Sequence, residues 1–252
     1  IPEFIWQKYI DLNGVSIPIK NMPFSFGIKL LLCSGDYEYP ERTLISLIIK
    51  RGMNVIEMGT SIGIITAIVA QKIGVNGKIV TVEASTKKYN ISKSWLLKIF
   101  PNIKLINGFA FPCKEYPEDI TINDFDDSMN SLGGKLNFSI KNQGDSIDFS
   151  KKSKKNKKNI NLQKFDIDTI EKSFLNKSAD LLISDVEGAE TIILNSFCPF
   201  PETLKYIVIE LHPFDYSSDK TEEKIINKII ASNFAIAMKI ENSYLFIKNK
   251  TN

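Results

Sequence analysis

Short apolar runs alternate with helical patterns from about residue 41 to the end of the chain. Runs rich in apolar and β-branched residues predict strands, whereas apolar positions that recur every three or four residues predict helices. The predicted strands are Met53–Met58, Lys78–Glu83, Ile103–Ile106, Ala179–Ser184 and Tyr206–Leu211. The predicted helices are Glu41–Lys50, Ile62–Ile73, Thr86–Phe100, Ile167–Leu175, Glu187–Ser196 and Lys220–Ser232.

The last two apolar runs, Phe234–Ile240 and Tyr244–Lys248, flank a short turn and predict a hairpin. Strands that alternate with helices in this way predict an α/β fold, with a doubly wound, mostly parallel sheet covered by helices on both faces. The hairpin would add an antiparallel strand at one edge. In such Rossmann-like sheets, ligands bind beyond the carboxyl ends of the strands.

The alternation is interrupted between residues 111 and 161, where Asp, Ser, Asn, Gly and Lys are frequent. Only Leu136–Ile140 and Ile160–Gln163 have weak strand patterns there. We interpret this stretch as an insertion in a single domain of residues 1–252, and residues 1–39 as an N-terminal extension. A chain of 252 residues is long enough for one such domain with a well-buried core.

The composition adds constraints on location and on the kind of site. Apolar residues make up 43% of the chain and charged residues 24%, which is ordinary for a soluble globular protein. No apolar run is long enough for a transmembrane helix, and no signal peptide is recognisable. The three cysteines are far apart, which argues against zinc or a disulfide framework. We therefore expect a cytoplasmic protein.

The positive charge is concentrated in six lysines between Lys151 and Lys158. Without them, the formal net charge of +3 would become −3 for the rest of the chain. A run of like charge is usually a solvated loop. Alternatively, it is a clamp for an anionic acceptor such as an acidic glycan, a nucleotide sugar or RNA. No aromatic residue interleaves with the lysines, so nucleic acid is the less favoured partner.

A glycine loop follows the first predicted strand, with Glu57 before Gly59 and Gly63. A dinucleotide would require GxGxxG, with a helix N-terminus directed at a pyrophosphate. The GxxxG spacing suits a cofactor without phosphate, such as S-adenosyl-L-methionine, whose cationic amino group can pair with a carboxylate. Glu83 ends the next strand, where an acid commonly binds ribose hydroxyls. The plain alternatives are an ordinary strand–helix turn and a solvated glutamate.

A second polar group follows two later strands. Asp185, Glu187 and Glu190 come directly after Ala179–Ser184, and His212 comes after Tyr206–Leu211. Helix capping and the helix dipole would explain the acids without any function. His212 is the only histidine, and its ordinary pKa suits proton removal near neutral pH.

Together these residues resemble the FkbM-type methyltransferases. The resemblance rests on Glu57-Met-Gly-Thr-Ser-Ile-Gly-Ile-Ile-Thr66, Val82-Glu-Ala84, Asp185-Val-Glu-Gly-Ala-Glu190 and Ile209-Glu-Leu-His212, in that order, with Tyr37-Glu38 upstream. It implies a class I methyltransferase fold and methyl transfer from S-adenosyl-L-methionine, usually to a hydroxyl of a sugar, glycan or small metabolite. The sequence departs from the family at Glu57, where Asp is usual, at Thr60-Ser61, where Ala-Asn is usual, and at Ala84, where Pro is usual.

The resemblance implies a role for each matching residue. The residues expected at the cofactor are Tyr37, Glu38, Glu57, Gly59, Ser61, Gly63, Glu83, Ala84, Ala110 and Asp185. The residues expected at the methyl acceptor are Asp185, Glu187 and His212.

Several alternatives stay open on the sequence alone. Asp185 or His212 could remove the acceptor proton, with Glu210 orienting His212. The preferred mechanism assigns no metal, but Asp185, Glu187 and Glu210 could hold Mg²⁺ or Ca²⁺ in a metal-assisted version. A non-catalytic module that binds S-adenosylmethionine or a nucleotide is the alternative from another class. Methylation of RNA through the lysine run is a further one, and the missing GxGxxG argues against a dehydrogenase.

Overall fold

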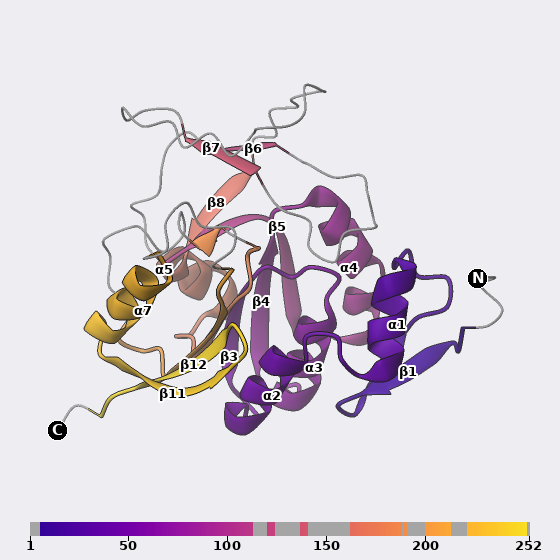
Figure 1. Ribbon diagram of the computed structural model, residues 1–252, viewed down its shortest axis with the longest axis horizontal. Coiled ribbons are helices and arrows are strands. Elements are labelled where there is room, and N and C mark those ends of the chain that lie inside the picture. Colours follow the sequence, from indigo (N-terminus) through magenta and orange to yellow (C-terminus); the bar gives the residue numbers. More distant parts are fainter. Residues whose placement is uncertain are drawn as a thin grey trace.

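The computed structural model describes residues 6–112, 120–123, 137–140, 162–187, 189–190, 200–212 and 221–250. Its centre is a sheet of eight strands in the order β11-β12-β10-β9-β3-β4-β5-β8 (Figure 1). These strands are β3 (Asn54–Met58), β4 (Lys78–Glu83), β5 (Ile103–Phe111), β8 (Gln163–Asp166), β9 (Leu181–Ser184), β10 (Tyr206–Glu210), β11 (Phe234–Ile240) and β12 (Ser243–Lys248).

The sheet is doubly wound about β3. From β3 the chain continues through β4 and β5 to β8 on one side, and then returns to β9 and β10 on the other. All the pairs among these six strands are parallel. The order therefore reverses between β3 and β9, at the point where ligands bind in sheets of this kind. The predicted fold class is confirmed.

The closing hairpin forms, and it adds an antiparallel edge strand to the sheet, as the sequence predicted. Strand β12 pairs antiparallel with both β10 and β11, so it lies between them and β11 forms the edge. Strand β11 is thus the antiparallel edge strand, and β12 joins it to the parallel part of the sheet. Sequence periodicity cannot fix this order, because both strands of a hairpin have the same alternating pattern.

Two hydrophobic cores explain why the central strands are apolar along their whole length. Alternate residues point to opposite faces of a strand. Val55 of β3 and Ile183 of β9 belong to the core on one face, whereas Ile56 and Leu182 belong to the core on the other. A sheet covered on both faces therefore needs continuous apolar runs, as the sequence has here.

Helices cover both faces. The first core includes side chains of α1 (Phe26–Ser34), α2 (Tyr39–Ile48), α3 (Ile64–Ile73) and α4 (Thr86–Ile99). The second includes side chains of α5 (Ile167–Ile170), the π-helical turn η2 (Glu171–Leu175) and α7 (Thr221–Ala231). The predicted helices agree with these within two residues at most ends. None of the helices in the described part of the chain is long and apolar enough to span a membrane, and the cytoplasmic location stays a prediction.

Two predicted strands had wrong bounds. Strand β5 continues beyond Ile106 to Phe111, because Gly108–Phe111 pairs with β8. Strand β8 covers Gln163–Asp166 and therefore continues beyond the weak pattern at Ile160–Gln163. It ends at Asp166, which caps the following helix by accepting hydrogen bonds from the backbone N–H and the hydroxyl of Thr169.

The N-terminal extension contains a hairpin of β1 (Tyr9–Leu12) and β2 (Val15–Pro18), followed by α1. Val15, Ile17 and Leu32 are buried in the same core as α2 and α3. Arg42 of α2 ties the extension down, since its Nε donates to the Tyr37 carbonyl at 2.7 Å. The N-terminal and C-terminal hairpins lie at opposite ends of the molecule (Figure 1).

Parts of the predicted insertion and one predicted helix lie outside the described residues. Strands β6 (Ile120–Asn123) and β7 (Asn137–Ile140) form a two-stranded antiparallel ribbon, which confirms the weak pattern at Leu136–Ile140. The lysine run 151–158 and most of the helix predicted for Glu187–Ser196 are not described. The division of the chain into a single domain with an insertion therefore stays a prediction.

Candidate functional site

The loop after β3 is pressed against the end of β9. Gly59 has a φ of 93°, and a Cβ atom added to it would lie 1.7 Å from the backbone oxygen of Asp185. Any side chain at this position would therefore separate the two strand ends. A contact within the chain therefore explains why glycine is required here. The same contact brings Gly59, predicted at the cofactor, together with Asp185, predicted to be catalytic.

The rest of this loop has an unusual backbone. Ser61 has a φ of 51° and Gly63 a φ of 91°, both in the left-handed region. A Cβ atom on Gly63 would lie 2.6 Å from Leu96 Cδ1 of α4. Trp95 Nε1 donates to the Ile62 carbonyl at 3.0 Å, which fixes the turn from outside. Helix α3 begins directly after this turn, at Ile64, with Gly63 as its N-cap residue.

Glu83, at the end of β4, holds the loop through its carboxylate. The backbone N–H groups of Ser61 and Ser85 each donate to it at 2.7 Å. Burial raises the pKa of Glu83, while Lys88 and these two amides oppose the rise. A carboxylate has about four acceptor sites, so this one can still accept hydrogen bonds from a ligand. Its position therefore fits the predicted contact with ribose hydroxyls.

Glu57 lies beneath the loop. Its side chain is 1% exposed, and Oε2 accepts a hydrogen bond of 2.6 Å from the Thr66 hydroxyl of α3. Burial raises its pKa to about 7, against the opposing effect of hydrogen bonds from Thr66 and Thr81. The glutamate that stands where the family usually has aspartate is thus surrounded by hydroxyls of the protein.

Tyr37 and Glu38 bring the segment before α2 to the same loop. The Tyr37 hydroxyl lies near Ser61 and Glu38, and burial, together with the charge of Glu38, raises its pKa well above its usual range. Glu38 has a left-handed backbone, with a φ of 48°. Among the described residues, none donates a hydrogen bond to Glu38 Oε2, although this atom is buried. Burial raises the pKa of Glu38 well above its usual range, and the charges of Glu41, Glu57 and Glu210 add to the effect.

The other two predicted cofactor residues lie on the strands beyond β3. Ala84 follows β4 and is partly buried against the second core. Ala110 lies near the end of β5, where it is paired with Phe165 of β8 and buried in that core. Ala110 therefore packs in the second core near the carboxyl end of β5.

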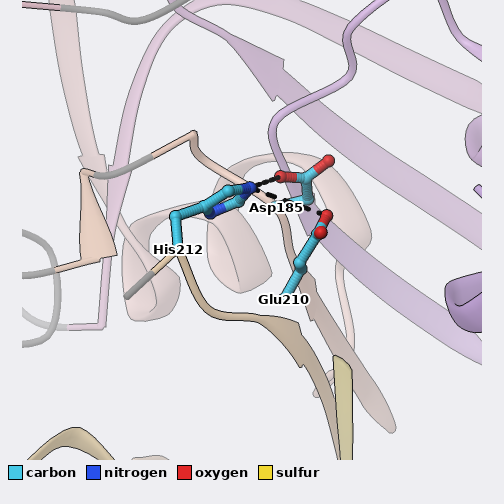
Figure 2. A group of neighbouring side chains, drawn as sticks. All are labelled: Asp185, Glu210 and His212. Atoms are coloured by element: carbon cyan, nitrogen blue, oxygen red, sulfur yellow. Dashed lines mark ion pairs between the residues drawn. The ribbon is translucent and has the colours of Figure 1, made fainter. Parts of the chain in front are cut away.

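The predicted catalytic residues meet at the ends of β9 and β10. His212 Nε2 lies 3.7 Å from Asp185 Oδ1, 3.8 Å from Glu187 Oε2 and 3.7 Å from Glu210 Oε2. Figure 2 shows the Asp185 and Glu210 carboxylates pointing at the same side of the His212 ring. Asp185, Glu187, Glu210 and His212 are together called the Asp185–His212 cluster below.

Charges within the Asp185–His212 cluster shift one another. Burial raises the pKa of Asp185 well above its usual range, and Glu187, Glu210 and Glu38 raise it further. Burial and Glu41 raise the pKa of Glu210 to about 7, against the effect of His212. Burial lowers the pKa of His212, but Glu190, Asp185 and Glu210 outweigh it and bring it to about 10. The cluster therefore attracts positive charge strongly.

Two residues that sequence reasoning did not assign to the site complete it. Glu190 is 0% exposed, and His212 Nδ1 donates to its Oε1 at 2.8 Å. Glu190, not Glu210, is thus the hydrogen-bonded partner of this ring nitrogen. Lys88 of α4 lies 4.0 Å from Glu187, and its pKa is raised by Glu83 and Glu187 against the effect of burial. Glu190 could have been assigned from the sequence, because it follows Asp185 and Glu187 in the same short acidic segment. No pattern in the sequence around Lys88 indicates its role.

The arrangement has the chemistry that the predicted cofactor requires. Gly59 brings the loop against the end of β9, Glu83 offers oxygen acceptors, and the buried Glu38 Oε2 accepts no hydrogen bond from the described residues. S-adenosylmethionine has ribose hydroxyls and a cationic amino group, which are the groups that such acceptors bind. The Asp185–His212 cluster lies next to this region, because Asp185 contacts Gly59.

The match to a family model decides the assignment. The model of the methyltransferase FkbM domain matches residues 57–238, which is well over half of the chain. The chain belongs to the FkbM methyltransferase family. The family resemblance found in the sequence is thereby confirmed, and so is the prediction of a methyltransferase that uses S-adenosyl-L-methionine. The match begins at Glu57 and includes both the glycine loop and the Asp185–His212 cluster.

Solved structures with a similar arrangement are distant. Fibrillarin from Aeropyrum pernix with bound S-adenosyl-L-methionine is 12% identical, with 79% of this chain and 66% of that chain covered and a TM-score of 0.43. A putative rRNA methylase from Clostridium thermocellum is 12% identical, with coverages of 83% and 94% and a TM-score of 0.44. An S-adenosylmethionine-dependent O-methyltransferase from Thermotoga maritima is 13% identical, with coverages of 84% and 64% and a TM-score of 0.42. A comparison with curated proteins found no match.

Proposed function

We propose that this FkbM-family methyltransferase methylates a hydroxyl oxygen of a sugar, glycan or small metabolite. The observation that carries the proposal is the contact between Gly59 and Asp185, where a Cβ atom would lie 1.7 Å from the Asp185 backbone oxygen. Through this contact the cofactor loop directly adjoins a cluster of proton acceptors. An acceptor hydroxyl bound at the Asp185–His212 cluster would therefore lie beside a methyl donor bound at the loop.

The residues have defined tasks in this reaction. When bound, S-adenosylmethionine supplies a methyl group on a positively charged sulfur, which keeps the electron pair of the broken carbon–sulfur bond. The acceptor oxygen forms the new bond to carbon and loses its proton, so the protein must orient that oxygen and receive the proton. Asp185 and His212 both lie where they could receive it, directly or through a water molecule. Because the pKa of His212 is raised to about 10, the ring could accept the proton only when its Nε2 carries none.

Glu187 and Glu190 would assist the proton transfer through their contacts with His212. The hydrogen bond of 2.8 Å from His212 Nδ1 to the buried Glu190 fixes the ring, so that its Nε2 is directed towards the carboxylates. Glu187 lies 3.8 Å from Nε2 and 4.0 Å from Lys88 Nζ, which places it between the two halves of the site. A ring held in one orientation receives a proton with little reorganisation.

The charge of the site supports a neutral acceptor group at the reacting centre. Asp185, Glu187 and Glu210 surround one histidine, so a phosphate or carboxylate placed among them would be repelled. An anionic acceptor would have to keep its charged groups away from the cluster, for example at the lysine run 151–158. A nucleic acid has a phosphate at every nucleotide, so it fits this environment less well than an acceptor that offers only a sugar hydroxyl.

The proposal is tested first by binding and then by turnover. Calorimetry with S-adenosylmethionine should show one site, and a panel of sugars, glycans and hydroxylated metabolites should include one that yields S-adenosylhomocysteine. Transfer of a carbon-13 methyl group, followed by NMR of the product, distinguishes an O-methyl from an N-methyl or C-methyl group. Methylation at nitrogen or carbon would overturn the proposal, and binding without turnover on any acceptor would favour a non-catalytic module.

Variants test the assigned residues. Asp185→Asn and His212→Ala should each lower kcat by about 100-fold or more, because proton transfer contributes roughly 10²–10⁴-fold to such reactions. Their affinities for S-adenosylmethionine should change much less than kcat. Glu223→Gln is the control, since Glu223 is exposed on α7. Full turnover in both site variants would show that neither residue receives the proton.

A further inference from the structure

The Asp185–His212 cluster has the spacing of a set of metal ligands. The distances from His212 Nε2 to Asp185 Oδ1 and Glu210 Oε2 are both 3.7 Å. Hydrogen bonds between such atoms would be about 2.7–3.2 Å long. A divalent ion held roughly 2.0–2.6 Å from each ligand atom separates those atoms by about 3–4 Å. The two distances of 3.7 Å from His212 Nε2 fall in this range, and one atom from each of Asp185, Glu210 and His212 lies within 4.8 Å of the others.

A second observation concerns Asp185. Its Oδ1 atom is inaccessible to solvent, and no donor among the described residues forms a hydrogen bond with it. This is the same oxygen that lies 3.7 Å from His212 Nε2. Leaving a buried polar oxygen unsatisfied costs about 1–3 kcal/mol. A cation bound in the cluster would satisfy this oxygen.

A third observation concerns the far side of the imidazole ring. His212 Nδ1 donates to Glu190 Oε1 at 2.8 Å, and Glu190 is fully buried. Histidines that bind metals through one ring nitrogen almost always donate the other N–H to a carboxylate or carbonyl, which fixes the tautomer and the ring orientation. The Glu190–His212 pair has this arrangement, with Nε2 directed towards Asp185 and Glu210.

We propose that Asp185, Glu210 and His212 bind a divalent cation of the Mn²⁺ class, with Glu187 beside it and Glu190 orienting the histidine. Carboxylates suit Mg²⁺, Ca²⁺ and Mn²⁺, while imidazole favours transition metals, so a mixed set that is rich in oxygen favours Mn²⁺ over Mg²⁺ or Ca²⁺. The inclusion of His212 therefore changes the kind of ion from the one that oxygen ligands alone would select.

The role of this ion rests on the proposed function, whereas its binding does not. Three protein ligands leave coordination positions for water or for hydroxyl oxygens of an acceptor. An acceptor hydroxyl bound there would be oriented towards the cofactor loop and would lose its proton more readily. An acceptor with two adjacent hydroxyls, as in many sugars, could occupy two positions at once.

The binding test uses the whole chain, freed of metal with a chelator and without cofactor. Titration with MnCl₂, followed by the EPR signal of free Mn²⁺, should show one bound ion per chain. Glu210→Gln should weaken binding by about 10-fold or more through loss of a ligand, and Glu190→Gln by about 10-fold through loss of the orienting carboxylate. Glu223→Gln should bind as the unaltered chain does. A 100-fold excess of Mg²⁺ should leave most of the Mn²⁺ bound.

A spectroscopic test needs no variant and therefore does not depend on variants that fold. Pulsed EPR of the Mn²⁺ complex should detect coupling to one imidazole nitrogen, and His212 is the only histidine in the chain. Absence of this coupling, absence of binding at millimolar Mn²⁺, or equal affinity of Glu210→Gln and the unaltered chain would each overturn the site. Loss of the coupling in a folded His212→Gln variant would support it.

The metal site and the proposed function can fail separately. Calorimetry with S-adenosylmethionine on the chelated protein measures the cofactor site alone. Cofactor binding together with methyl transfer to oxygen in the presence of a chelator would overturn the role of the ion and leave the proposed function intact. Mn²⁺ binding with nitrogen coupling, but without methyl transfer to any hydroxyl, would support the site and count against the proposed function.

Discussion

The two groups of carboxylates at this end of the sheet differ in how their oxygens are satisfied. Glu83 and Glu57, on the β3–β4 side, accept hydrogen bonds from Ser61, Ser85 and Thr66 of the chain itself. Asp185 and Glu210, on the β9–β10 side, face His212 across distances near 3.7 Å, and one Asp185 oxygen has no donor among the described residues. The first group is preorganised by the protein, whereas the second needs positive charge from a proton or a cation.

This difference follows from what surrounds each group. Glu57 and Glu83 lie close to donors of the chain, because the Ser61 backbone N–H of the loop reaches Glu83 and the Thr66 hydroxyl of α3 reaches Glu57. The cluster lies at two strand ends that supply acids but few donors. A site that fixes a cofactor needs rigidity, while a site that handles a proton or an ion needs unsatisfied acceptors. Both requirements are met within one edge of the sheet.

The largest effect is expected where the two groups touch. Gly59→Ala places a Cβ atom 1.7 Å from the Asp185 backbone oxygen at a φ of 93°, so the loop and the β9 end must separate. We expect a loss of about 3 kcal/mol or more in the free energy of unfolding, from strain and overpacking together. Affinity for S-adenosylmethionine should fall by about 100-fold or more, which calorimetry measures.

Gly35→Ala is the matched control for that change. Gly35 also has a positive φ, of 82°, but no atom lies within 4 Å of its added Cβ position. Only the backbone cost of about 1–2 kcal/mol should remain, with no change in cofactor affinity. Equal effects of the two substitutions would mean that backbone strain, and not the contact with Asp185, accounts for Gly59.

The next largest effect should come from Glu83→Gln. The amide keeps the size of the side chain but loses the charge and one of the two acceptors that bind Ser61 and Ser85. Hydrogen bonds to a charged group are worth roughly 1.5–3 kcal/mol, so cofactor affinity should fall by about 10–100-fold. Calorimetry at constant pH measures this, and an unchanged affinity would show that the ribose does not bind at Glu83.

Glu57→Gln should stabilise the cofactor-free protein, and more so at higher pH. Burial raises the folded pKa of Glu57 from 4.5 to about 7, so folding opposes its ionisation. The destabilisation is absent below pH 4.5, grows between pH 4.5 and 7, and is full above pH 7, where it amounts to at most about 3 kcal/mol.

Urea denaturation at several pH values checks this prediction. The difference between Glu57→Gln and the unaltered chain should be near zero at pH 4.5 and largest at pH 8. Glu223→Gln, on an exposed part of α7, should show no such trend. A difference that stays constant with pH would mean that Glu57 does not titrate in this range.

The smallest effect is expected for Lys88→Met, which removes the cation between the two groups. Lys88 lies 4.0 Å from Glu187, and about a quarter of each side chain is exposed. An ion pair of this kind contributes at most about 1 kcal/mol, and less at high salt. The free energy of unfolding should fall by that amount in dilute buffer. A loss of more than about 2 kcal/mol would show that the two groups depend on each other.

Most of the fold could be predicted because its signals are local. The runs that became β3 and β4, and the helical pattern that became α4, have an apolar period that needs no knowledge of the rest of the chain. The bounds of β5 and β8 could not be predicted in this way, because Gly108–Phe111 is a strand only through its pairing with β8. The N-terminal hairpin was missed for a similar reason, since short strands depend on the core that they cover.

The site was predictable in its residue types more than in its contacts. Glu83, Asp185 and His212 could be named because the carboxyl ends of parallel strands share one edge of a sheet. The contact of Glu190 with His212 joins the segment after β9 to the segment after β10, and the two residues are 22 positions apart in the sequence. Lys88 of α4 lies near Glu187 although almost 100 positions separate them in the sequence, and no local sequence pattern can predict such a contact.

The sequence by itself determined the alternation of strands and helices, the glycine loop at Gly59 and Gly63, and the acids and histidine at the strand ends. Only the tertiary structure decided that Gly59 contacts Asp185, that β12 enters the sheet between β10 and β11, and that Glu190 holds His212. The physical reason is the range of the interactions. Backbone preferences and apolar periodicity act over a few residues, whereas the satisfaction of a buried carboxylate depends on whichever distant donors the packed core brings to it.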